Sequence, residues 1–399
     1  MIAPEPFFEP RGTPFSEYHR IRALTALGHD VDLVTYPFGQ AVSMPGLRIF
    51  RCARPPFISR VKIGPSAAKL PLDAMLTLTA VRRAAAERYD AIHSHEEGGV
   101  IGAALSAILR VPHLYDMHSS LPQQLTNFAF SGSRILRAVF VALERFMIRR
   151  SRAVIVICPS LEETVRAIAP DARTVLIENA PGSVEEQATS EQAAAVRASL
   201  GLAASTPIVL YTGTFEAYQG LDLLFDAWAV ARRRVPSDAR LVLAGGKPDQ
   251  IAAARELARR AGVDASTVFA GERPASEIPA YLLAADALVS PRSRGTNTPL
   301  KIYQYLRSGK PIVATRLLTH TQVLDDDTAM LTDATAEAFG AGIAAALTDR
   351  ARAAAIGRQA QRLAETKYSY EAYLEKTRQA CAALFEARRP HAQPAKDVA

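Results

Sequence analysis

Short apolar segments alternate with helical segments along both halves of the chain, and this alternation limits the possible folds more than any other feature. The first half contains the strand-like segments HDVDLVTY, YDAIHSH, VPHLYDMH and RAVIVICPS. The second half contains PIVLYTGTF, ARLVLAGG, TVFAG and ALVSP, with helical segments such as LDLLFDAWAVARRRV between them. Because strands separated by helices pair in parallel, the pattern predicts an α/β protein whose parallel sheets are covered by helices.

A polar, alanine-rich segment, NAPGSVEEQATSEQAAAVRASLG, separates the two halves. A chain of 399 residues is long enough to form more than one hydrophobic core. We therefore expect one parallel-sheet domain over residues 1–180 and a second over residues 181–365. A further helical segment over residues 366–388 contains a break at TKYSYEAY, and residues 389–399 form a polar tail that we expect to be disordered.

The composition indicates a globular cytoplasmic protein. Hydrophobic residues make up 49% of the chain and charged residues 22%. No apolar run reaches the ~18 residues of a membrane span, and the opening MIAPEPFFEP resembles the tail of a strand rather than a signal peptide. Cys52, Cys158 and Cys381 are too widely spaced for a metal or disulfide pattern. The net charge of +7 favours an anionic partner, which is a nucleotide, a phosphate or a membrane surface.

The stretch GTNTPLKIYQYLRSGKPIVAT, residues 295–315, has the pattern of a ligand site at the edge of a parallel sheet. It follows the strand ALVSP and passes from a polar loop into a helix with Lys301 in its first turn. Free N–H groups at the helix start, together with this lysine, favour a phosphate. The alternative is an ordinary capped helix with Thr298 at the N-cap, Pro299 at the first helical position and an exposed lysine. Small side chains allow a ligand to approach the backbone at Gly295, Thr296, Asn297 and Thr298.

Two histidine-containing segments end strands of the first half. His118, in YDMHSS, follows Asp116 and is either a functional or a structural histidine. In HSHEEGG, His93 and His95 share one face of a strand, and Glu96 follows directly. A metal is one reading of this segment, but three or four convincing ligands are not visible. We expect His95 and Glu96 to contact the acceptor side of a cleft, and no metal to be bound.

The segment SRILRAVFVALERFMIRRSR predicts an amphipathic helix with one basic face. At ~100° per residue its arginines fall within about 120° of one another, interrupted by Val141 and Ile148. Such a face suits an anionic membrane surface, and the alternative is an ordinary solvated helix. The arginines are Arg134, Arg137, Arg145, Arg149 and Arg152. The expected core-facing stripe is Leu136, Val139, Phe140, Leu143 and Met147.

An ordered set of segments resembles the family-4 retaining glycosyltransferases. These are LGHDVDLVT, LYTGTFEAYQGLDLLFDA, LVLAGG, VFAGERPASEIPAYLLAADALVSP and PLKIYQYLRSGKPIVAT. The resemblance implies the GT-B fold, in which two Rossmann-like domains face each other across a cleft. It implies that the first domain binds the acceptor, the second binds a nucleotide sugar, and the C-terminal helix crosses back to the first domain. The nucleotide sugar, linked to UDP or GDP, is then a co-substrate, and no cofactor or metal is expected.

The resemblance also implies roles for particular residues. His118 matches the histidine that the family places beside the donor sugar. The family's usual diphosphate cations are missing, and Arg292, Arg294, Lys301 and Lys247 are the candidates to replace them. The segment EPRGTP matches a glycine loop near the same diphosphate through Arg11 and Gly12, although an ordinary turn is the alternative. Further donor contacts are expected at Gly213, Arg292, Asn297, Thr298, Pro299 and Leu300.

Four positions depart from the family pattern. The family has two glutamates eight positions apart, where this chain has Thr296 and Gln304. Gln304 retains amide hydrogen-bonding capacity for a ribose but offers no charged acceptor. The family's basic pair after the glycine of the second domain's first strand is replaced by Thr214 and Gln219. A degenerate glycosyltransferase that serves as a binding or scaffold subunit is therefore the alternative function.

Two other classes are disfavoured by the sequence. No GxGxxG segment follows a strand with an acidic residue about 20 positions later, which argues against a dinucleotide-dependent oxidoreductase. The basic residues outside the arginine-rich helix are scattered and no recognition module is visible, so no nucleic acid partner is expected. The expected partners are a nucleotide-sugar donor, a glycan, lipid-linked or small-molecule acceptor, and an anionic membrane contacted peripherally.

Overall fold

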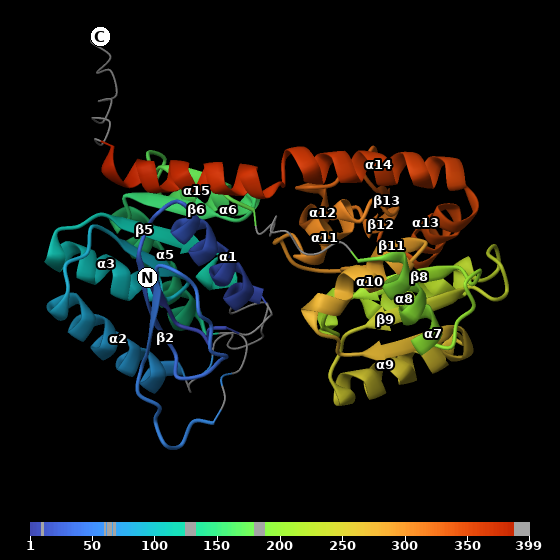
Figure 1. Cartoon of the computed structure of the whole chain (residues 1–399), viewed down its shortest axis with the longest axis horizontal. Helices are drawn as coiled ribbons and strands as arrows, with labels where there is room; N and C mark the ends of the chain where they lie inside the picture. The colour runs from blue at the N-terminus through green and yellow to red at the C-terminus, as the bar shows by residue number, and fades with distance from the viewer. Residues whose placement is uncertain are drawn as a thin grey trace, which may run out of the picture.

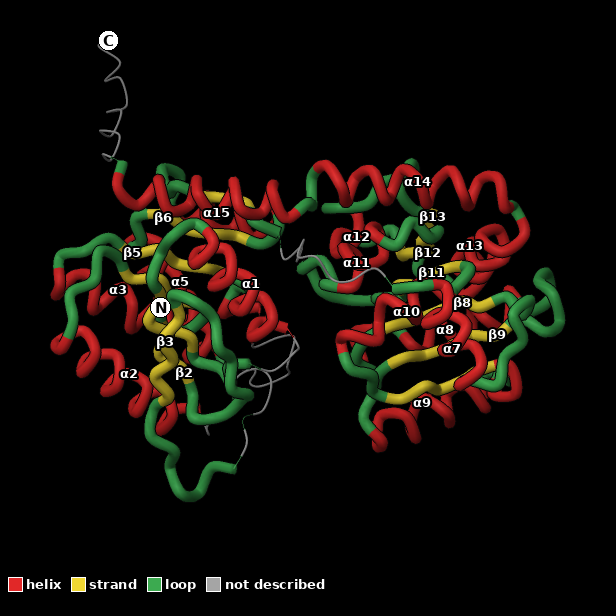
Figure 2. The backbone as a smooth tube through the Cα atoms, viewed as in Figure 1, coloured by secondary structure: helices red, strands yellow, loops and turns green. Residues whose placement is uncertain are grey.

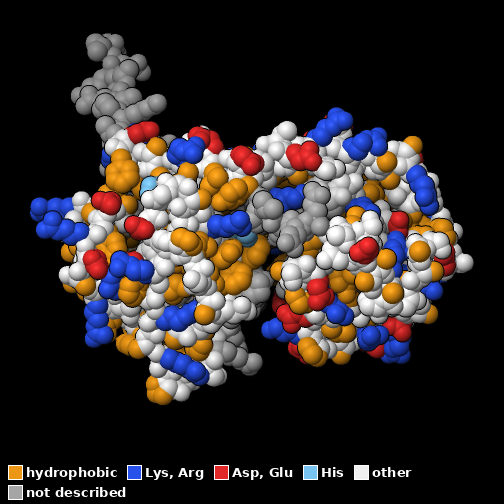
Figure 3. All heavy atoms as spheres, viewed as in Figure 1, with side chains coloured by type: hydrophobic (Ala, Val, Ile, Leu, Met, Phe, Trp, Pro, Cys, Tyr) orange, Lys and Arg blue, Asp and Glu red, His pale blue; other side chains and the backbone are white. Residues whose placement is uncertain are grey.

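A computed structural model describes the chain except for residues 9–11, 60, 62–65, 67–68, 124–132, 179–187 and 387–399. Two α/β bodies lie side by side and are bridged along one edge by two consecutive helices (Figure 1). In the space-filling view the bodies form two lobes with a notch between them at the opposite edge (Figure 3). None of the described helices has the length and apolarity that crossing a membrane requires.

The first body is a seven-stranded parallel sheet in the order β3-β2-β1-β4-β5-β6-β7. Its strands are β1 (Ile2–Ala3), β2 (Val31–Thr35), β3 (Leu47–Arg51), β4 (Ile92–His95), β5 (His113–Met117), β6 (Ala153–Val156) and β7 (Thr174–Leu176). Its helices are α1 (Gly12–Ala26), α2 (Lys69–Ala86), α3 (Gly98–Leu109), α5 (Arg134–Arg150) and α6 (Pro159–Ile168).

The second body is a six-stranded parallel sheet in the order β10-β9-β8-β11-β12-β13. Its strands are β8 (Ile208–Thr212), β9 (Arg240–Ala244), β10 (Thr267–Gly271), β11 (Ala287–Ser290), β12 (Ile312–Thr315) and β13 (Met330–Thr332). Its helices are α7 (Ser190–Ser199), α8 (Leu221–Ala231), α9 (Pro248–Arg260), α10 (Ile278–Ala284), α11 (Lys301–Arg307), α12 (Leu318–Thr321), α13 (Ala336–Thr348) and α14 (Arg350–Thr366).

Both sheets are doubly wound, and the strand order reverses once in each. The reversal lies between β1 and β4 in the first sheet and between β8 and β11 in the second. Apart from β3, β7 and β10, most strand residues are buried on both faces, which explains why they read as continuous apolar runs rather than alternating ones. The predicted two-domain Rossmann-like architecture is confirmed. In such sheets ligands bind outside the carboxyl ends of the strands near the reversal, which directs attention to β4, β5, β8 and β11.

The chain returns to the first body through α15 (Tyr370–Phe385), which follows α14 after residues 367–369. Figures 1 and 2 show α14 lying along the second body and α15 along the first. Ser369 caps α15 by accepting a 3.1 Å hydrogen bond from the N–H of Ala372. The apolar side of α15 packs in one core cluster with first-domain residues; this cluster includes Ala23, Leu114, Ala153, Ile155, Tyr373, Ala380 and Leu384.

The orientation of α5 differs in part from the sequence prediction. Val139, expected in the core, is 46% exposed, whereas Ile148, expected on the basic face, is 1% exposed. The helix packs against α3 and α6 along an edge that includes Glu144, Met147 and Ile148, so its buried side is rotated from the predicted one. The buried carboxylate of Glu144 accepts a 2.8 Å hydrogen bond from the N–H of Leu121, which explains why a charged residue lies on that edge.

Candidate functional site at the domain interface

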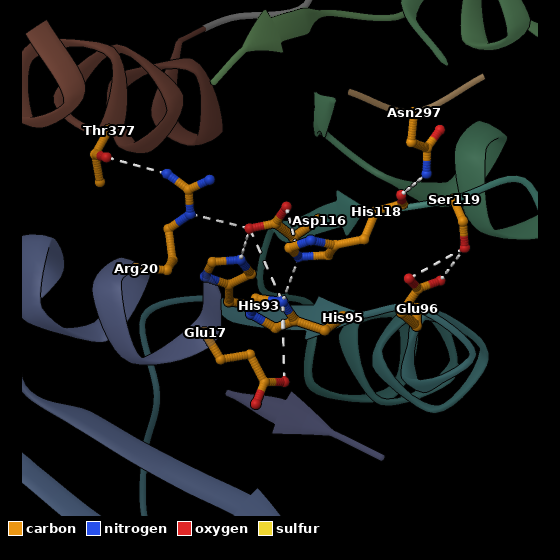
Figure 4. A network of polar contacts seen from close by, with 10 residues as sticks. All are labelled: Glu17, Arg20, His93, His95, Glu96, Asp116, His118, Ser119, Asn297 and Thr377. Carbon is orange, nitrogen blue, oxygen red and sulfur yellow. Dashed lines mark hydrogen bonds and ion pairs between the residues drawn. The ribbon is translucent and has the colours of Figure 1, made fainter. Parts of the chain in front are cut away.

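The loop after β11 contacts the carboxyl end of β5 in the other domain. Asn297 donates through Nδ2 to the main-chain oxygen of His118 at 2.8 Å, and Thr296 donates through Oγ1 to Oε1 of Gln123 at 3.2 Å. Figure 4 shows Asn297 reaching the strand end that carries His118. The structure therefore brings Asn297, a predicted donor residue of the second domain, against the predicted sugar-binding histidine of the first, and Thr296 against Gln123 nearby in sequence.

Lys301 is buried, with 8% of the residue exposed. Its Nζ lies 3.7 Å from the centre of the Tyr211 ring and has no hydrogen-bond partner among the described residues. Burial, together with the positive charge of Arg292, lowers the pKa of Lys301 well below its ordinary value. The alternative of an exposed lysine is wrong, because the first turn of α11 faces inward beneath β8. A buried cation without a carboxylate partner is a favourable place for an anion.

Gly213 leaves space in front of this lysine. It follows β8 with φ +129°, and a Cβ placed on it would lie 3.3 Å from Nζ of Lys301. The backbone conformation and the close approach both favour glycine at this position. Its neighbour Thr214 is exposed, and the main-chain oxygen of Thr214 accepts a 2.7 Å hydrogen bond from the hydroxyl of Tyr211. Two of the predicted donor residues, Gly213 and Lys301, are thus adjacent.

Arg292 supplies a second positive charge at the same edge of the sheet. Its guanidinium donates to the main-chain oxygens of Asn297 at 2.8 Å and Arg294 at 3.0 Å, and it lies 5.0 Å from the centre of the Tyr218 ring. Burial lowers the pKa of Arg292, but an arginine remains charged in proteins. The side chain therefore holds the loop that carries Thr296 and Asn297 in place.

The remaining predicted donor residues are less tightly grouped. Thr298 is buried, and α11 begins at Lys301 with Leu300 at its N-cap, so the alternative of a helix capped by Thr298 with Pro299 at its first position is wrong. Leu300 at the N-cap has helical angles, with φ −54° and ψ −36°. The carbonyl of Pro299 accepts the N–H of Ile302.

Four predicted residues lie away from these contacts or outside the described chain. Gln304 is half-buried on α11, one turn after Lys301. Gln219 is buried, and its Oε1 has no hydrogen-bond partner within the described ranges. Gly12 is the first residue of α1, and Arg11 lies outside the described residues.

Asp116, on β5, is the centre of a buried polar cluster (Figure 4). Its Oδ2 lies 3.0 Å from Nε of Arg20 and 3.4 Å from Nε2 of His93. Its Oδ1 lies 3.3 Å from Nε2 of His118, and Nδ1 of His95 is 3.1 Å from the same His118 nitrogen. All five side chains are buried. The predicted residues His95 and His118 are therefore in direct contact with each other. Asp116, two residues before His118 in the sequence, lies beside both of them.

The charges in this cluster are balanced. Burial opposes ionisation of Asp116, but the Arg20 guanidinium outweighs it and holds the pKa of Asp116 well below its ordinary value. Burial lowers the pKa of His93, His95 and His118. The cluster is thus one guanidinium and one carboxylate surrounded by neutral imidazoles.

The same residues offer ligand atoms for a metal, but their arrangement suits hydrogen bonding better. Single ligand atoms of His93, His95 and Asp116 lie within 4.8 Å of one another. The rings of His93 and His95 are stacked at 4.8 Å and 19°, and those of His95 and His118 at 5.3 Å and 25°, whereas a metal needs lone pairs that converge. The guanidinium of Arg20 would in addition repel a cation bound to Asp116.

Carboxyl groups surround the other side of the cluster. Glu96, with φ +45°, is buried and its carboxylate accepts a 3.0 Å hydrogen bond from Oγ of Ser119. Glu17, on α1, is fully buried, with Nδ1 of His95 at 4.0 Å. Burial first, and neighbouring carboxyl groups second, raise the pKa of Glu17 and Glu96 well above their ordinary values. Of the predicted acceptor-side pair, His95 is therefore part of the cluster that contains His118, and Glu96 lies beside it.

Three residues of this site were not predicted from the sequence: Glu17 and Arg20 on α1, and Tyr211 on β8. A signal for the first two was present, because they are three apart in SEYHRIRALTALG on the face that also carries apolar residues. A charged pair on the buried face of a helix indicates a polar partner inside the protein. Tyr211 gave no such signal, since it reads as an ordinary strand residue.

Two family models match the chain, one on each domain. The description "Glycosyl transferase 4-like domain" matches residues 18–180, and "Glycosyl transferases group 1" matches residues 206–349. The chain belongs to the family-4 glycosyltransferases. The first match contains the part of α1 from Tyr18 on, the histidine cluster and α5, and the second contains Gly213, the loop after β11 and Lys301.

Curated and solved proteins agree with this assignment. The D-inositol 3-phosphate glycosyltransferase of Corynebacterium diphtheriae is 26% identical over 265 residues, which are 62% of this chain and 59% of that protein. The chain thus spans less than two thirds of this relative. The sucrose-phosphate synthase of Thermosynechococcus elongatus has a TM-score of 0.77 at 22% identity, covering 96% of this chain and 98% of that chain. Anabaena HepE in complex with UDP and glucose has a TM-score of 0.74 at 17% identity, covering 96% and 98%. At these identities the structural matches show the GT-B fold of the family-4 glycosyltransferase.

Proposed function

We propose that this glycosyltransferase transfers a sugar from a nucleotide-diphosphate sugar to a glycan, a lipid-linked acceptor or a small molecule, with retention of anomeric configuration. The observation that carries the proposal is Lys301, a buried cation beside Gly213 whose Nζ has no hydrogen-bond partner in the part of the chain described. The charge that develops on a departing diphosphate is the group such a cation stabilises. The family membership and the UDP complex of the structural relative HepE support this class of donor.

The residues divide the task between the two domains. Lys301 and the backbone around Thr298 and Leu300 bind the diphosphate, with Arg292 as a second positive charge. Gln304 binds the ribose, and His118 binds the donor sugar from the first domain. His95 and Glu96 border the acceptor. No side chain acts as a nucleophile in this scheme, and no metal or cofactor takes part, because the two cations neutralise the diphosphate.

The donor class is tested by a thermal-shift panel of UDP, GDP, ADP, UDP-glucose and GDP-mannose on the whole chain. A nucleotide that binds only the folded protein raises the melting temperature by mass action. We expect one base to give a clear shift, followed by hydrolysis or transfer of the matching nucleotide sugar. A shift without any turnover would favour the scaffold subunit, and no shift with any nucleotide would contradict donor binding.

Gln304 provides a separate test of the ribose position. Gln304→Leu removes the amide and should weaken nucleoside diphosphate binding, whereas Gln304→Glu supplies a charge-assisted acceptor and should maintain or strengthen it. Because a hydrogen bond of this kind contributes about 0.5–1.5 kcal/mol, the expected loss in the leucine variant is roughly two- to tenfold. Isothermal titration with the nucleotide found by the panel measures both variants. If Gln304→Leu binds the nucleotide as tightly as the parent does, Gln304 does not contact the donor.

We further propose that the protein is cytoplasmic and associates with anionic membranes through α5. The exposed arginines of this helix are accompanied by exposed apolar side chains, since Ile135 is 79%, Val139 46% and Phe146 37% exposed. Val141 and Phe146 line a surface hollow together with arginines of the same helix. The exposed arginines are Arg134, Arg137, Arg145, Arg149 and Arg150. A basic helix face with embedded apolar groups binds anionic lipid by charge and by shallow burial.

Membrane binding is expected to disappear when the charge of α5 is reduced. Each arginine near anionic lipid contributes about 1 kcal/mol, so changing Arg137, Arg145 and Arg149 to Gln should lower partitioning by roughly two orders of magnitude. Co-sedimentation with phosphatidylserine-containing vesicles, and with purely zwitterionic vesicles, measures the effect.

The matched control changes three exposed arginines of α14, which are Arg352, Arg358 and Arg362, to Gln. It lowers the net charge by the same amount on the second domain and should leave partitioning unchanged. If both variants and the parent partition equally, α5 is an ordinary solvated helix and the proposed membrane binding through it is wrong.

A further inference from the structure

We propose that Asp116, held by Arg20, is a positioning residue that fixes His118 in the tautomer protonated at Nε2, so that Nδ1 presents a lone pair to a hydroxyl of the bound sugar. The chemical role of that lone pair rests on the proposed function, whereas the tautomer itself does not. The inference starts from the surroundings of the two ring nitrogens of His118.

The Nε2 atom of His118 lies between two acceptors. Oδ1 of Asp116 is 3.3 Å away and Nδ1 of His95 is 3.1 Å away. An ionised carboxylate only accepts hydrogen bonds, so a proton on Nε2 is favoured and a lone pair on Nε2 would face negative charge. With that proton in place, Nδ1 of His95 is the accepting nitrogen of its own ring. The two neighbouring histidines therefore have consistent tautomers.

Asp116 stays ionised and oriented because its other oxygen is occupied. Oδ2 accepts a 3.0 Å hydrogen bond from Nε of Arg20 and faces Nε2 of His93 at 3.4 Å. Oδ1 has no hydrogen-bond partner among the described residues, and the ring nitrogen Nε2 of His118 at 3.3 Å is a charge contact of this oxygen. The pKa of Asp116 is accordingly held well below its ordinary value.

Arg20 is in turn fixed from the crossing helix. Its Nη1 donates to Oγ1 of Thr377 at 3.2 Å, and its guanidinium lies 4.9 Å from the centre of the Tyr373 ring. Only 1% of Arg20 is exposed, so water does not compete for these contacts. The chain of contacts thus runs from α15, through α1, to the end of β5.

The second ring nitrogen of His118 remains available. Nδ1 is buried and has no hydrogen-bond partner in the described part of the molecule. The main chain of the same residue is held by Asn297 of the second domain at 2.8 Å. A neutral imidazole polarised by Asp116 is a strong acceptor, and its partial negative charge also stabilises positive charge that develops on a sugar as its bond to the diphosphate breaks.

The tautomer is tested directly by NMR of the whole chain labelled with ¹⁵N-histidine. His118 is assigned by the signals lost in His118→Gln. In the parent, Nδ1 of His118 should give the shift of an unprotonated ring nitrogen and Nε2 that of a protonated one. In Asp116→Asn, the side-chain amide donates to Nε2 and the assignment should reverse or become mixed. A parent protonated at Nδ1, or an unchanged pattern in Asp116→Asn, would overturn the proposal.

Kinetic measurements distinguish a loss of His118 positioning from general damage to the fold. With the nucleotide sugar found by the panel, Asp116→Asn should lower kcat about tenfold or more while leaving KM nearly unchanged. Arg20→Lys, which keeps the charge, should retain more activity than Arg20→Met. If neither the parent nor any variant turns over a donor, the proposed function is contradicted. The NMR experiment would still test the tautomer of His118 independently.

The matched control is Lys376→Met. It removes an ion pair between α15 and the first domain, in which Nζ of Lys376 lies 2.5 Å from Glu178, without touching Asp116. We expect the His118 signals and the kinetic constants of this variant to match the parent. If Lys376→Met changes them as much as Asp116→Asn does, docking of α15 rather than the carboxylate positions His118, and the proposal is wrong.

Discussion

Lys301→Met is expected to stabilise the protein while weakening nucleoside diphosphate binding, two effects of opposite sign from one substitution. The parent buries Nζ against the Tyr211 ring without a hydrogen-bond partner in the described residues. Removing an unpaired buried cation should raise the free energy of unfolding by about 1–3 kcal/mol. Loss of a charged hydrogen bond to phosphate, worth about 1.5–3 kcal/mol, should weaken binding roughly ten- to hundredfold.

The pH dependence of the free energy of unfolding tests the same prediction independently. The pKa of Lys301 is lowered well below 10.5 in the folded protein, so below that pH the unfolded chain binds the additional proton more readily. The stability of the parent should therefore rise with pH toward 10.5, and this contribution should be missing from Lys301→Met. Diphosphate binding should also take up a proton in the parent, because an anion favours the charged lysine.

Denaturant unfolding and isothermal titration measure the two effects. Lys310→Met is the matched control, since Lys310 is half-buried at the opposite, amino-terminal end of β12. It should leave diphosphate affinity unchanged. Unaltered affinity in Lys301→Met, or a loss of stability in place of a gain, would contradict the assignment of a buried anion-binding cation.

Breaking the ion pair between Arg20 and Asp116 is expected to destabilise the first domain strongly. The two side chains are 1% and 0% exposed, and the contact is 3.0 Å. Removal of one partner leaves the other charge buried and unpaired, so Arg20→Met or Asp116→Leu should each lower the free energy of unfolding by about 3–5 kcal/mol. The double variant buries neither charge and should be considerably more stable than the sum of the single losses implies.

Urea unfolding of the four proteins completes this double-mutant cycle. The exposed pair Arg316–Asp326, with side chains 45% and 68% exposed, is the comparison, because a surface ion pair contributes at most about 1 kcal/mol. Additive losses from Arg20→Met and Asp116→Leu would mean that the two charges are satisfied independently, by His93, Thr377 and water rather than by each other.

The fold was predictable because buried parallel strands leave an unmistakable pattern. β8, β11 and β12 are apolar on both faces, and each is followed by a helical segment, so their number and direction follow from the sequence. The position of Lys301 was predictable for the same reason, since it follows from the strand before it. Its burial was not, because it arises from packing against Tyr211 and Gly213 in a distant segment, which local patterns do not specify.

The polar cluster of the first domain was only partly predictable. His95 was recognised from strand periodicity, and His118 with Asp116 from their place at a strand end, but their partner Arg20 is 96 residues from Asp116 in the sequence. Pairings over such distances depend on how helices pack on the sheet, which local patterns do not specify. The same limit explains α5, where a helical wheel gave the basic face but packing against α3 and α6 decided that Ile148 is buried and Val139 exposed.

The crossing of α15 has a consequence for how the protein is made. The first domain is synthesised first, yet Tyr373, Ala380 and Leu384 fill part of its core and Thr377 binds Arg20. On the ribosome, the surface that α15 covers stays open until α15 itself has emerged, by which time the second domain has already been synthesised. The amino-terminal domain is thus the last to finish folding, and a nascent chain that stalls after α14 exposes Ala23, Leu114 and their apolar neighbours to chaperones.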